Sequence, residues 1–317
     1  MKRRTFLRQL GSGAVGLLPG TAVLSGALGR GRGERLVERW SWVMGQSVQL
    51  KLFADSDDHG YEAASAALAE LRRIEARLSV FDDASDLCEF NRRAGRPAAP
   101  IGADLHAVLS AGARFQGLTT GAFDLAVEPL MRAWGFRQPR AAAPSARELA
   151  EATRAVRESR VILDGPRATL ATAEARVDAG GIAVGYGLDR AAAVIKGLGI
   201  RRAFLDISGD CLAVGSPPGE RGWRVAIVDS ARPRRQPRVV ELRDAALATS
   251  ANTVAAIRYG RTLAGHVMDP LAGRPASALV QASVLARTGI EADALSTALL
   301  VSGRPAPGVI AWFTPDA

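Results

Sequence analysis

The chain contains very little cysteine, lysine and histidine, and few aromatic side chains. Of 317 residues, two are Cys, three are Lys and three are His, and aromatic residues make up 5%. Two cysteines exclude a disulfide-rich scaffold. Because Cys88 and Cys211 lie far apart and have no C-x-x-C spacing, we expect two free thiols, with a single disulfide as the alternative.

The basic residues are almost all arginine. The chain carries 41 Lys and Arg against 32 Asp and Glu, a net charge of +9, and only three of the 41 are lysine. The arginines are scattered and form no basic stripe along one helix, so we expect no nucleic-acid partner. With 48% hydrophobic and 23% charged residues, the composition is that of a globular protein, which excludes a collagen, a coiled coil and a mostly disordered chain.

Residues 1–29 are predicted to be a targeting segment ahead of one folded domain, residues 30–317. The paired arginines Arg3 and Arg4 precede a weakly apolar stretch rich in glycine and alanine, which resembles a twin-arginine export signal and predicts a periplasmic or otherwise exported protein. The alternative is a basic arm before a buried helix, which Pro19 and six glycines disfavour. The stretch is also too short and glycine-rich for a membrane span, so we expect no stable span in the mature chain. Because it holds four basic and no acidic residues, its removal leaves a net charge of +5.

Strand and helix periodicities are mixed along the rest of the chain. Residues 48–53 alternate apolar and polar as a half-buried strand does, and residues 62–78 carry leucine and isoleucine at helical spacing. Without steady β-α alternation, we predict an α+β fold with mixed or antiparallel sheets and packed helices. Asp104 is the expected N-cap of its helix. Further helices are predicted over 104–118, 147–159, 186–198 and 292–301, and further strands over 161–163, 169–171, 203–207, 223–228, 239–242, 254–259 and 309–314.

The segment 177–189 is the most unusual in the sequence. Asp178 follows a predicted strand, Gly180 and Gly181 come next, and a helix begins soon after. Such an arrangement lets backbone N–H groups approach a phosphate at a helix N-terminus. The segment is neither a Walker loop nor a G-x-G-x-x-G, so a purely structural turn is the alternative.

Two further segments carry polar groups at the ends of predicted strands. Asp206 and Asp210 flank a Ser-Gly pair, where a carboxylate orients a ligand or caps the turn. His266 lies between a strand and an Asp-Pro turn, which makes it a candidate general base, with a structural role as the alternative.

The last predicted helix carries a set of oxygen ligands. Asp293 and Thr297 are i and i+4 and therefore share one face, and Ser296 is adjacent. Carboxylate and hydroxyl oxygens suit Mg²⁺, which needs only one or two carboxylates when phosphate oxygens complete its shell. In the alternative, the Ser and Thr hydroxyls bond back to helix carbonyls.

Together these segments resemble the ApbE family of FAD:protein FMN transferases, in the family's order and over nearly all of the mature chain. A match to any one block is weak evidence for the family, but seven matches in the family's order are specific to it. The matching residues are Met44-Gly45; Leu78 to Phe81 with Ser85 to Leu87 and Phe90-Asn91; Gly121 to Asp124 with Pro129-Leu130 and Trp134 to Phe136; Asp178 to Asp189; Ser208 to Asp210; Ala248 to Ser250 with His266 to Pro270 and Gly273; and Ala292 to Ala298.

The resemblance implies an ApbE-like architecture related to the T-fold, and an activity. The family uses Mg²⁺ to split the FAD pyrophosphate and attaches FMN through a phosphoester to a Thr or Ser of a target redox protein, releasing AMP. It implies that His266 is the catalytic base and that the metal is held by Asp293, Thr297, Ser296 and the Gly181 carbonyl. The FAD-binding positions it implies are Met44, Phe81, Ala122, Phe123, Asp124, Asp178, Val184 and His266.

The chain departs from the family pattern at four positions. Val184 stands where the family usually has Lys, Phe81 stands for Tyr, and Ser208 and Ala251 stand for glycines. These changes keep two alternatives open: a periplasmic protein that binds FAD with little or no transfer, or an FAD pyrophosphatase that gives FMN and AMP.

Overall fold

A seven-stranded sheet forms the centre of the computed structural model, which describes residues 21–23, 33–252 and 255–315. The strand order is β17-β16-β11-β8-β7-β3-β2, and every neighbouring pair is antiparallel. Hairpins join β2 to β3 and β7 to β8 directly. The strands are β2 (Arg35–Val43), β3 (Gln46–Ala54), β7 (Arg202–Ile207), β8 (Asp210–Val214), β11 (Ala245–Ala251), β16 (Leu279–Ala286) and β17 (Ile310–Pro315).

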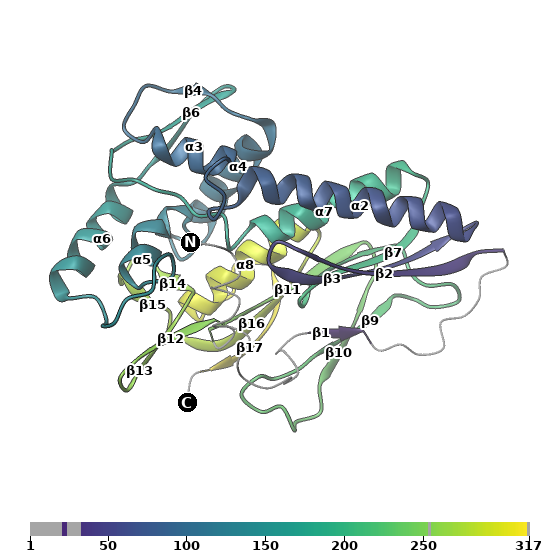
Figure 1. Cartoon of the computed structure of the whole chain (residues 1–317). Helices are drawn as coiled ribbons and strands as arrows, with labels where there is room; N and C mark the ends of the chain where they lie inside the picture. The colour runs from purple at the N-terminus through teal and green to yellow at the C-terminus, as the bar shows by residue number, and fades with distance from the viewer. Residues whose placement is uncertain (1–20, 24–32, 253–254, 316–317) are drawn as a thin grey trace.

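Three helices cover one face of this sheet (Figure 1): α2 (Asp57–Leu78), α7 (Ala183–Gly197) and α8 (Gly289–Ser302). Ser56 caps α2 by accepting the N–H of His59. The leucines and isoleucine predicted to form its apolar stripe are buried. Burial of each such side chain stabilises the fold by about 2 kcal/mol. Helix α7 packs between α2 and α8, so the chain segment that opens α7 lies near the middle of the helical layer.

The opposite face of the sheet packs against a smaller three-stranded sheet. Its strands are β1 (Thr21–Val23), β9 (Trp223–Ile227) and β10 (Arg238–Leu242), in the order β1-β9-β10. Aromatic rings fill the space between the two sheets: Trp223 lies 5.5 Å from Phe204 and 6.0 Å from Phe53, centroid to centroid.

A second group of elements lies at one end of the helical layer (Figure 1). It contains a short sheet of order β4-β6-β5 and two small hairpins, β12–β13 and β14–β15. The elements are α3 (Asp86–Arg92), β4 (Ala99–Pro100), α4 (Ala103–Leu118), the 3-10 helix η1 (Leu125–Val127), α5 (Glu128–Ala133), α6 (Ala146–Glu158), β5 (Val161–Asp164), β6 (Arg167–Leu170), β12 (Ala256–Tyr259), β13 (Thr262–Gly265), β14 (Met268–Asp269) and β15 (Arg274–Pro275).

The predicted α+β class with antiparallel sheets is confirmed. Cys88 and Cys211 are not joined by a disulfide, as expected. Of the predicted targeting segment, only residues 21–23 are described, as strand β1, and the rest lies outside the described residues. Among the helices that the structure describes, none is long and apolar enough to cross a membrane.

Two local predictions are wrong. Gly102, not Asp104, occupies the N-cap of α4, because the Asp104 carboxylate binds side chains of neighbouring helices instead. No strand leads directly into Asp178: β6 ends at Leu170, and the described residues 171–177 form none. The Asn91 side chain pairs there with the backbone of Val177, donating to its carbonyl and accepting its N–H at 2.8 Å each, and so replaces a strand neighbour.

The β7–β8 turn contains Ser208 and Gly209, both with positive φ (49° and 106°). Such two-residue hairpin turns favour Asn or Gly first, because other side chains are strained in the left-handed region. Ser208 therefore carries backbone strain where the family has glycine. The Asp206 carboxylate accepts the Gly209 N–H at 2.8 Å, which is the turn-capping alternative for this residue.

Replacing Asp206 by asparagine is expected to stabilise the protein near pH 8 by up to about 3 kcal/mol. Burial raises the pKa of Asp206 to about 6, from 3.8. Because the folded pKa exceeds the unfolded one, ionisation costs the folded state stability as the pH rises through this interval. Asparagine still accepts the Gly209 N–H but carries no charge. Melting temperatures should differ near pH 8 and converge near pH 4; an equal difference at both pH values contradicts this account.

Candidate active site

Helices α7 and α8 cross at two glycines. An ideal Cβ on Gly185 would lie 2.1 Å from the Gly289 carbonyl oxygen, and one on Gly289 would lie 2.4 Å from that of Gly185. The Asp189 carboxylate accepts the N–H groups of Gly289 and Ile290 at 2.7 and 2.9 Å, which ties α7 to the N-terminus of α8. This close crossing brings α8 side chains to the first turn of α7, where Gly185 donates its N–H to Asp293 Oδ2 at 2.9 Å.

Gly185→Ala is expected to lower the free energy of unfolding by about 3 kcal/mol, the upper part of the range for overpacking. The added methyl would meet backbone atoms of Gly289 and the Cβ of Asp293, which cannot rotate away. Gly197→Ala, in the last turn of the same helix and with open space around it, is the matched control and should be neutral or stabilising. The free energies of unfolding of both variants, measured in urea, test this close contact between α7 and α8. Equal values for the two variants would contradict it.

Of the residues predicted to hold a metal, Thr297 lies beside Gly181, and Ser250 links it to Ser296. Thr297 Oγ1 lies 3.1 Å from an ideal Cβ on Gly181, and Ser250 Oγ lies 2.7 Å from Ser296 Oγ and 3.3 Å from Thr297 Oγ1. The Ser296 hydroxyl also donates to the Asp293 carbonyl at 3.0 Å, as in the structural alternative. The structure thus brings together the loop before α7, one face of α8 and the strand β11.

A second carboxylate, Asp210, lies near Asp293. Burial raises the pKa of Asp293 to about 7. Burial, and next the charge of Asp293, raise the pKa of Asp210 well above its usual range. A divalent cation would relieve the cost of holding these charges in the protein interior. The donor set of carboxylate, hydroxyl and carbonyl oxygens fits Mg²⁺. No cluster of three or more His, Cys, Asp or Glu side chains that could hold a metal occurs within the described ranges.

Asp178 belongs to a buried ion network. Arg137 bonds both Asp178 and Glu128, with a shortest Arg137–Glu128 distance of 2.7 Å, and all three side chains are nearly inaccessible. Asp178 Oδ1 also accepts the Gly180 N–H at 2.7 Å. The Arg137 guanidinium lies 5.1 Å from the centroid of the Phe81 ring, which is 58% exposed. The exposed Phe81 ring thus lies over the Arg137 guanidinium, which Asp178 holds close to the glycine pair before α7.

His266 has one ring nitrogen fixed by the backbone. Its Nδ1 lies 3.2 Å from the Ala255 carbonyl oxygen, which is only an acceptor, so Nδ1 carries the proton and Nε2 keeps its lone pair. Burial lowers the pKa of His266 below 6.5, while the carboxylate of Asp178 opposes this shift. At neutral pH the ring is therefore neutral, with Nε2 able to accept a proton.

Three of the other predicted FAD-binding residues, Ala122, Phe123 and Asp124, lie in the block from Gly121 to Asp124. Ala122 and Phe123 are buried, and Phe123 packs edge-on against Phe115 at 6.2 Å and lies 3.4 Å from an ideal Cβ on Gly181. The Asp124 carboxylate accepts the N–H of Ala126 and a bond from Gln116, so it caps η1. This block supports the site from within the protein core.

Met44 and Val184 lie on the side of α7 that faces α2. Met44 occupies the β2–β3 turn with a φ of 56°, and its Cε lies 2.9 Å from an ideal Cβ on Gly187. Val184 is 8% exposed and packs among the apolar side chains between α7, α2 and the sheet. Val184 is therefore part of the core.

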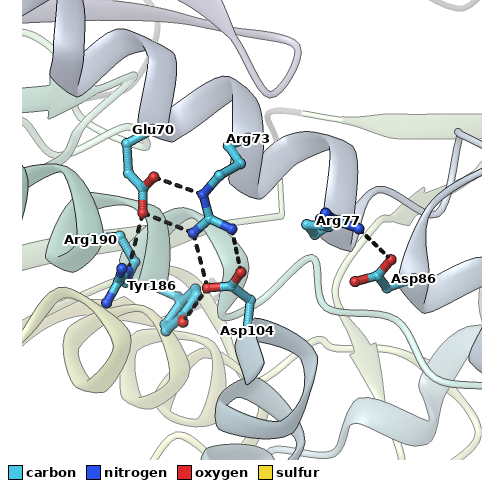
Figure 2. A network of polar contacts seen from close by, with 7 residues as sticks. All are labelled: Glu70, Arg73, Arg77, Asp86, Asp104, Tyr186 and Arg190. Carbon is cyan, nitrogen blue, oxygen red and sulfur yellow. Dashed lines mark hydrogen bonds and ion pairs between the residues drawn. The ribbon is translucent and has the colours of Figure 1, made fainter. Parts of the chain in front are cut away.

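A polar network fixes the start of α7 against two other helices (Figure 2). Tyr186 donates its hydroxyl to Asp104 of α4 at 2.7 Å, and Arg73 of α2 bonds both Asp104 and Glu70. Arg190 of α7 also bonds Glu70, at 3.2 Å. The hydrogen bond from Arg73 lowers the pKa of Asp104, so this carboxylate stays ionised. The network holds the glycine-rich segment that precedes α7 in place.

Sequence analysis does not single out Arg137, Glu128 or Ser250 as site residues. Arg137 and Asp178 are 41 residues apart, and a charged pair at that separation has no spacing rule to reveal it. Ser250 lies within a matching block, but only the packing of β11 against α8 brings it to Thr297.

The chain matches the model of the ApbE family over residues 44–312. A Vibrio cholerae protein named FAD:protein FMN transferase is 30% identical over 74% of this chain and 71% of its own length. A Haemophilus influenzae protein of the same name is 29% identical over 83% and 79%.

Solved structures agree with these sequence matches. The flavin transferase ApbE from Vibrio cholerae superposes with a TM-score of 0.76 at 25% identity, covering 88% of this chain and 93% of its own. The ApbE protein from Thermotoga maritima gives 0.77 at 27% identity, with coverages of 84% and 87%.

Proposed function

Because the chain belongs to the ApbE family, we propose that it is an Mg²⁺-dependent FAD:protein FMN transferase. It would move the FMN half of FAD to a Thr or Ser hydroxyl of a target redox protein through a phosphoester, and release AMP. The relatives whose names carry this activity align with most of the chain and over more than two thirds of their own length.

One observation supports this function most directly: two kinds of chemistry converge on one short segment. Asp178 bonds Arg137, whose guanidinium lies over the Phe81 ring, and Gly181 lies beside Thr297. One side offers an exposed aromatic ring for a flat flavin or adenine, and the other offers hard oxygen ligands for a cation beside a pyrophosphate.

The transfer requires one bond to form and one to break. The acceptor hydroxyl oxygen attacks the phosphorus of the FMN half, and the bond from this phosphorus to the bridging oxygen breaks, so that AMP leaves. The hydroxyl proton passes to Nε2 of His266, whose Nδ1–H is held by the Ala255 carbonyl. In the first turn of α7, Ala183 and Tyr186 donate their N–H groups to backbone carbonyls and Gly185 donates to Asp293, so these three donors are not available to the phosphate.

Asp293, Thr297, Ser296 and the Gly181 carbonyl are the residues that would hold Mg²⁺. When bound, the ion neutralises negative charge that develops on the pyrophosphate. Ser250 keeps the two α8 hydroxyls oriented through its bonds to Ser296 and Thr297.

The function is tested by incubating the protein with FAD, MgCl₂ and candidate acceptor domains, then separating the products by denaturing electrophoresis and chromatography. Covalent flavin fluorescence on an acceptor, together with one AMP per flavin attached, supports transfer. An acceptor whose target Thr is replaced by Ala, and a reaction with EDTA in place of MgCl₂, are the controls.

The two alternatives give different products in the same assay. Free FMN and AMP without labelled acceptor indicate a pyrophosphatase that uses water as acceptor. Unchanged FAD that remains bound to the protein indicates a flavin-binding protein. Either result, obtained with several acceptor domains, would overturn the proposed transfer.

We also propose that the protein acts after export. The support is the sequence of residues 1–29, with paired arginines, a weakly apolar stretch and no acidic residue. Replacing Arg3 and Arg4 by lysine should leave unprocessed protein in the cytoplasm, measured by cell fractionation. Unchanged localisation of the double variant would contradict a twin-arginine route.

A further inference from the structure

A groove with unpaired positive charge lies between α6 and the β14–β15 turn. Its volume is about 550 Å³, and it is lined by α6 and by residues 272–274 of the turn. Gly273 presses against α6: an ideal Cβ on Gly273 would lie 2.0 Å from Thr153 Oγ1. The turn and the helix are therefore in direct contact where they line the groove.

Three arginines line this groove: Arg154 and Arg157 on α6, and Arg274 on β15. All three are exposed, and within the described part of the chain none of them forms an ion pair, whereas Arg132, Arg140 and Arg147 nearby in the sequence are each paired with a carboxylate. Glu158 is the one acidic residue of the lining. The groove therefore has an excess of positive charge that an incoming carboxylate can neutralise by bidentate contacts.

Leu271 links the groove to the block from Gly121 to Asp124. Arg157 Nη2 donates to the Leu271 carbonyl at 3.0 Å, and the Leu271 side chain lies 3.4 Å from an ideal Cβ on Gly121. Gly121 opens the block that contains Phe123, which lies beside Gly181. Leu271 is 57% exposed, so its apolar side chain is accessible between the groove and this block.

We propose that this groove binds an acidic segment of the acceptor protein, next to the hydroxyl that receives FMN. The inference rests on the proposed function, because it names the chemistry of the partner for that same site. A protein segment fits better than a second nucleotide: carboxylates match the exposed guanidiniums and an apolar side chain matches Leu271, while the groove offers no aromatic ring to a base. Acidic residues close to the target hydroxyl then hold it against the active site.

The test uses charge reversal at two arginines, Arg154→Glu combined with Arg274→Glu, and leaves Arg157 in place because its side chain bonds the Leu271 carbonyl. The matched control is Arg160→Glu, an exposed arginine just after α6 that does not line the groove. The probes are two fluorescein-labelled peptides, one with a central Thr flanked by Asp and Glu, the other with the same Thr flanked by Lys. Binding is measured by fluorescence anisotropy at low and high salt.

The full-length protein is expected to bind the acidic peptide and not the basic one. The double variant should bind the acidic peptide at least about tenfold more weakly, the control should bind as the wild type does, and salt should weaken binding. In transfer assays, the double variant should raise KM for the acceptor by a similar factor while FAD affinity, followed by flavin fluorescence, stays the same.

Two results would overturn the proposal: equal binding of the acidic peptide by all three proteins, or a loss of FAD affinity in the double variant, which would assign the groove to the nucleotide. Failure of the proposed function has a different signature. In that case the wild type binds the acidic peptide in a charge-dependent way, which supports the groove, but no flavin becomes covalently attached to any acceptor.

Discussion

Asp293→Asn is expected to reduce FMN transfer at least about 100-fold. Asparagine keeps the shape of the side chain and still accepts the Gly185 N–H, but it removes the negative charge that a magnesium ion requires. The measurement is the rate of covalent flavin attachment at saturating FAD. A titration with MgCl₂ should give a higher half-saturating concentration for the variant.

A matched control is available in the neighbouring carboxylate. Asp210→Asn keeps the bond from the Thr249 N–H, at 2.9 Å in the wild type, and also removes a buried charge. Because Asp210 is not among the predicted ligands, we expect its loss to reduce transfer less than about tenfold. Melting temperatures of both variants should equal or exceed that of the wild type, since each removes a carboxylate whose pKa is raised by burial. Equal losses of transfer in the two variants would contradict the assignment of Asp293 as the ligand.

The placement of Asp293 and Thr297 on one face of α8 could be predicted because it depends on local spacing. Asp293 and Thr297 are one helical turn apart, so any helix at that position places them on one face. The glycine pair before α7 and the carboxylate of Asp178 were likewise recognisable as a segment. Local geometry and the order of the blocks were sufficient for these residues.

The ion pairs of Arg137 could not be predicted in the same way, because they depend on contacts between distant segments. Arg137 lies in a loop that separates α5 from α6, and only the fold brings it between Glu128 and Asp178. Asp104 illustrates the opposite error. A carboxylate at the start of a helix is expected to cap the helix N-terminus. In the folded protein, the Asp104 carboxylate instead bonds the side chains of Arg73 and Tyr186.

Strand β2 shows a related limit at the level of the fold. Its residues Arg35 to Val43 are mostly exposed, with charged residues and two exposed tryptophans, because it is an edge strand of the seven-stranded sheet. The apolar and polar alternation that identifies β3 is lost where one face is only partly covered. Strand β3 could thus be predicted from its sequence, while its neighbour β2 could not.

His266→Ala is expected to reduce transfer by about 10²–10⁴-fold, the usual contribution of a general base. The loss should appear in kcat rather than in the affinity for FAD, because the imidazole acts on the acceptor hydroxyl. The fixed Nδ1–H···O=C bond to Ala255 leaves Nε2 as the atom that accepts the proton. Added imidazole should restore part of the activity of the alanine variant, which a purely structural role for His266 would not allow.

The pH dependence of the transfer rate follows from the burial of His266. Since burial lowers the pKa of His266, the neutral and active form persists as the pH falls through 6.5, and the transfer rate should decline only at lower pH. In His266→Ala this acid limb should disappear, whereas Asp293→Asn should keep it at a lower rate. A wild-type limb centred well above pH 6.5, or the same limb in the alanine variant, would mean that another group takes the proton. His266 would then serve only to hold the Ala255 backbone beside the site.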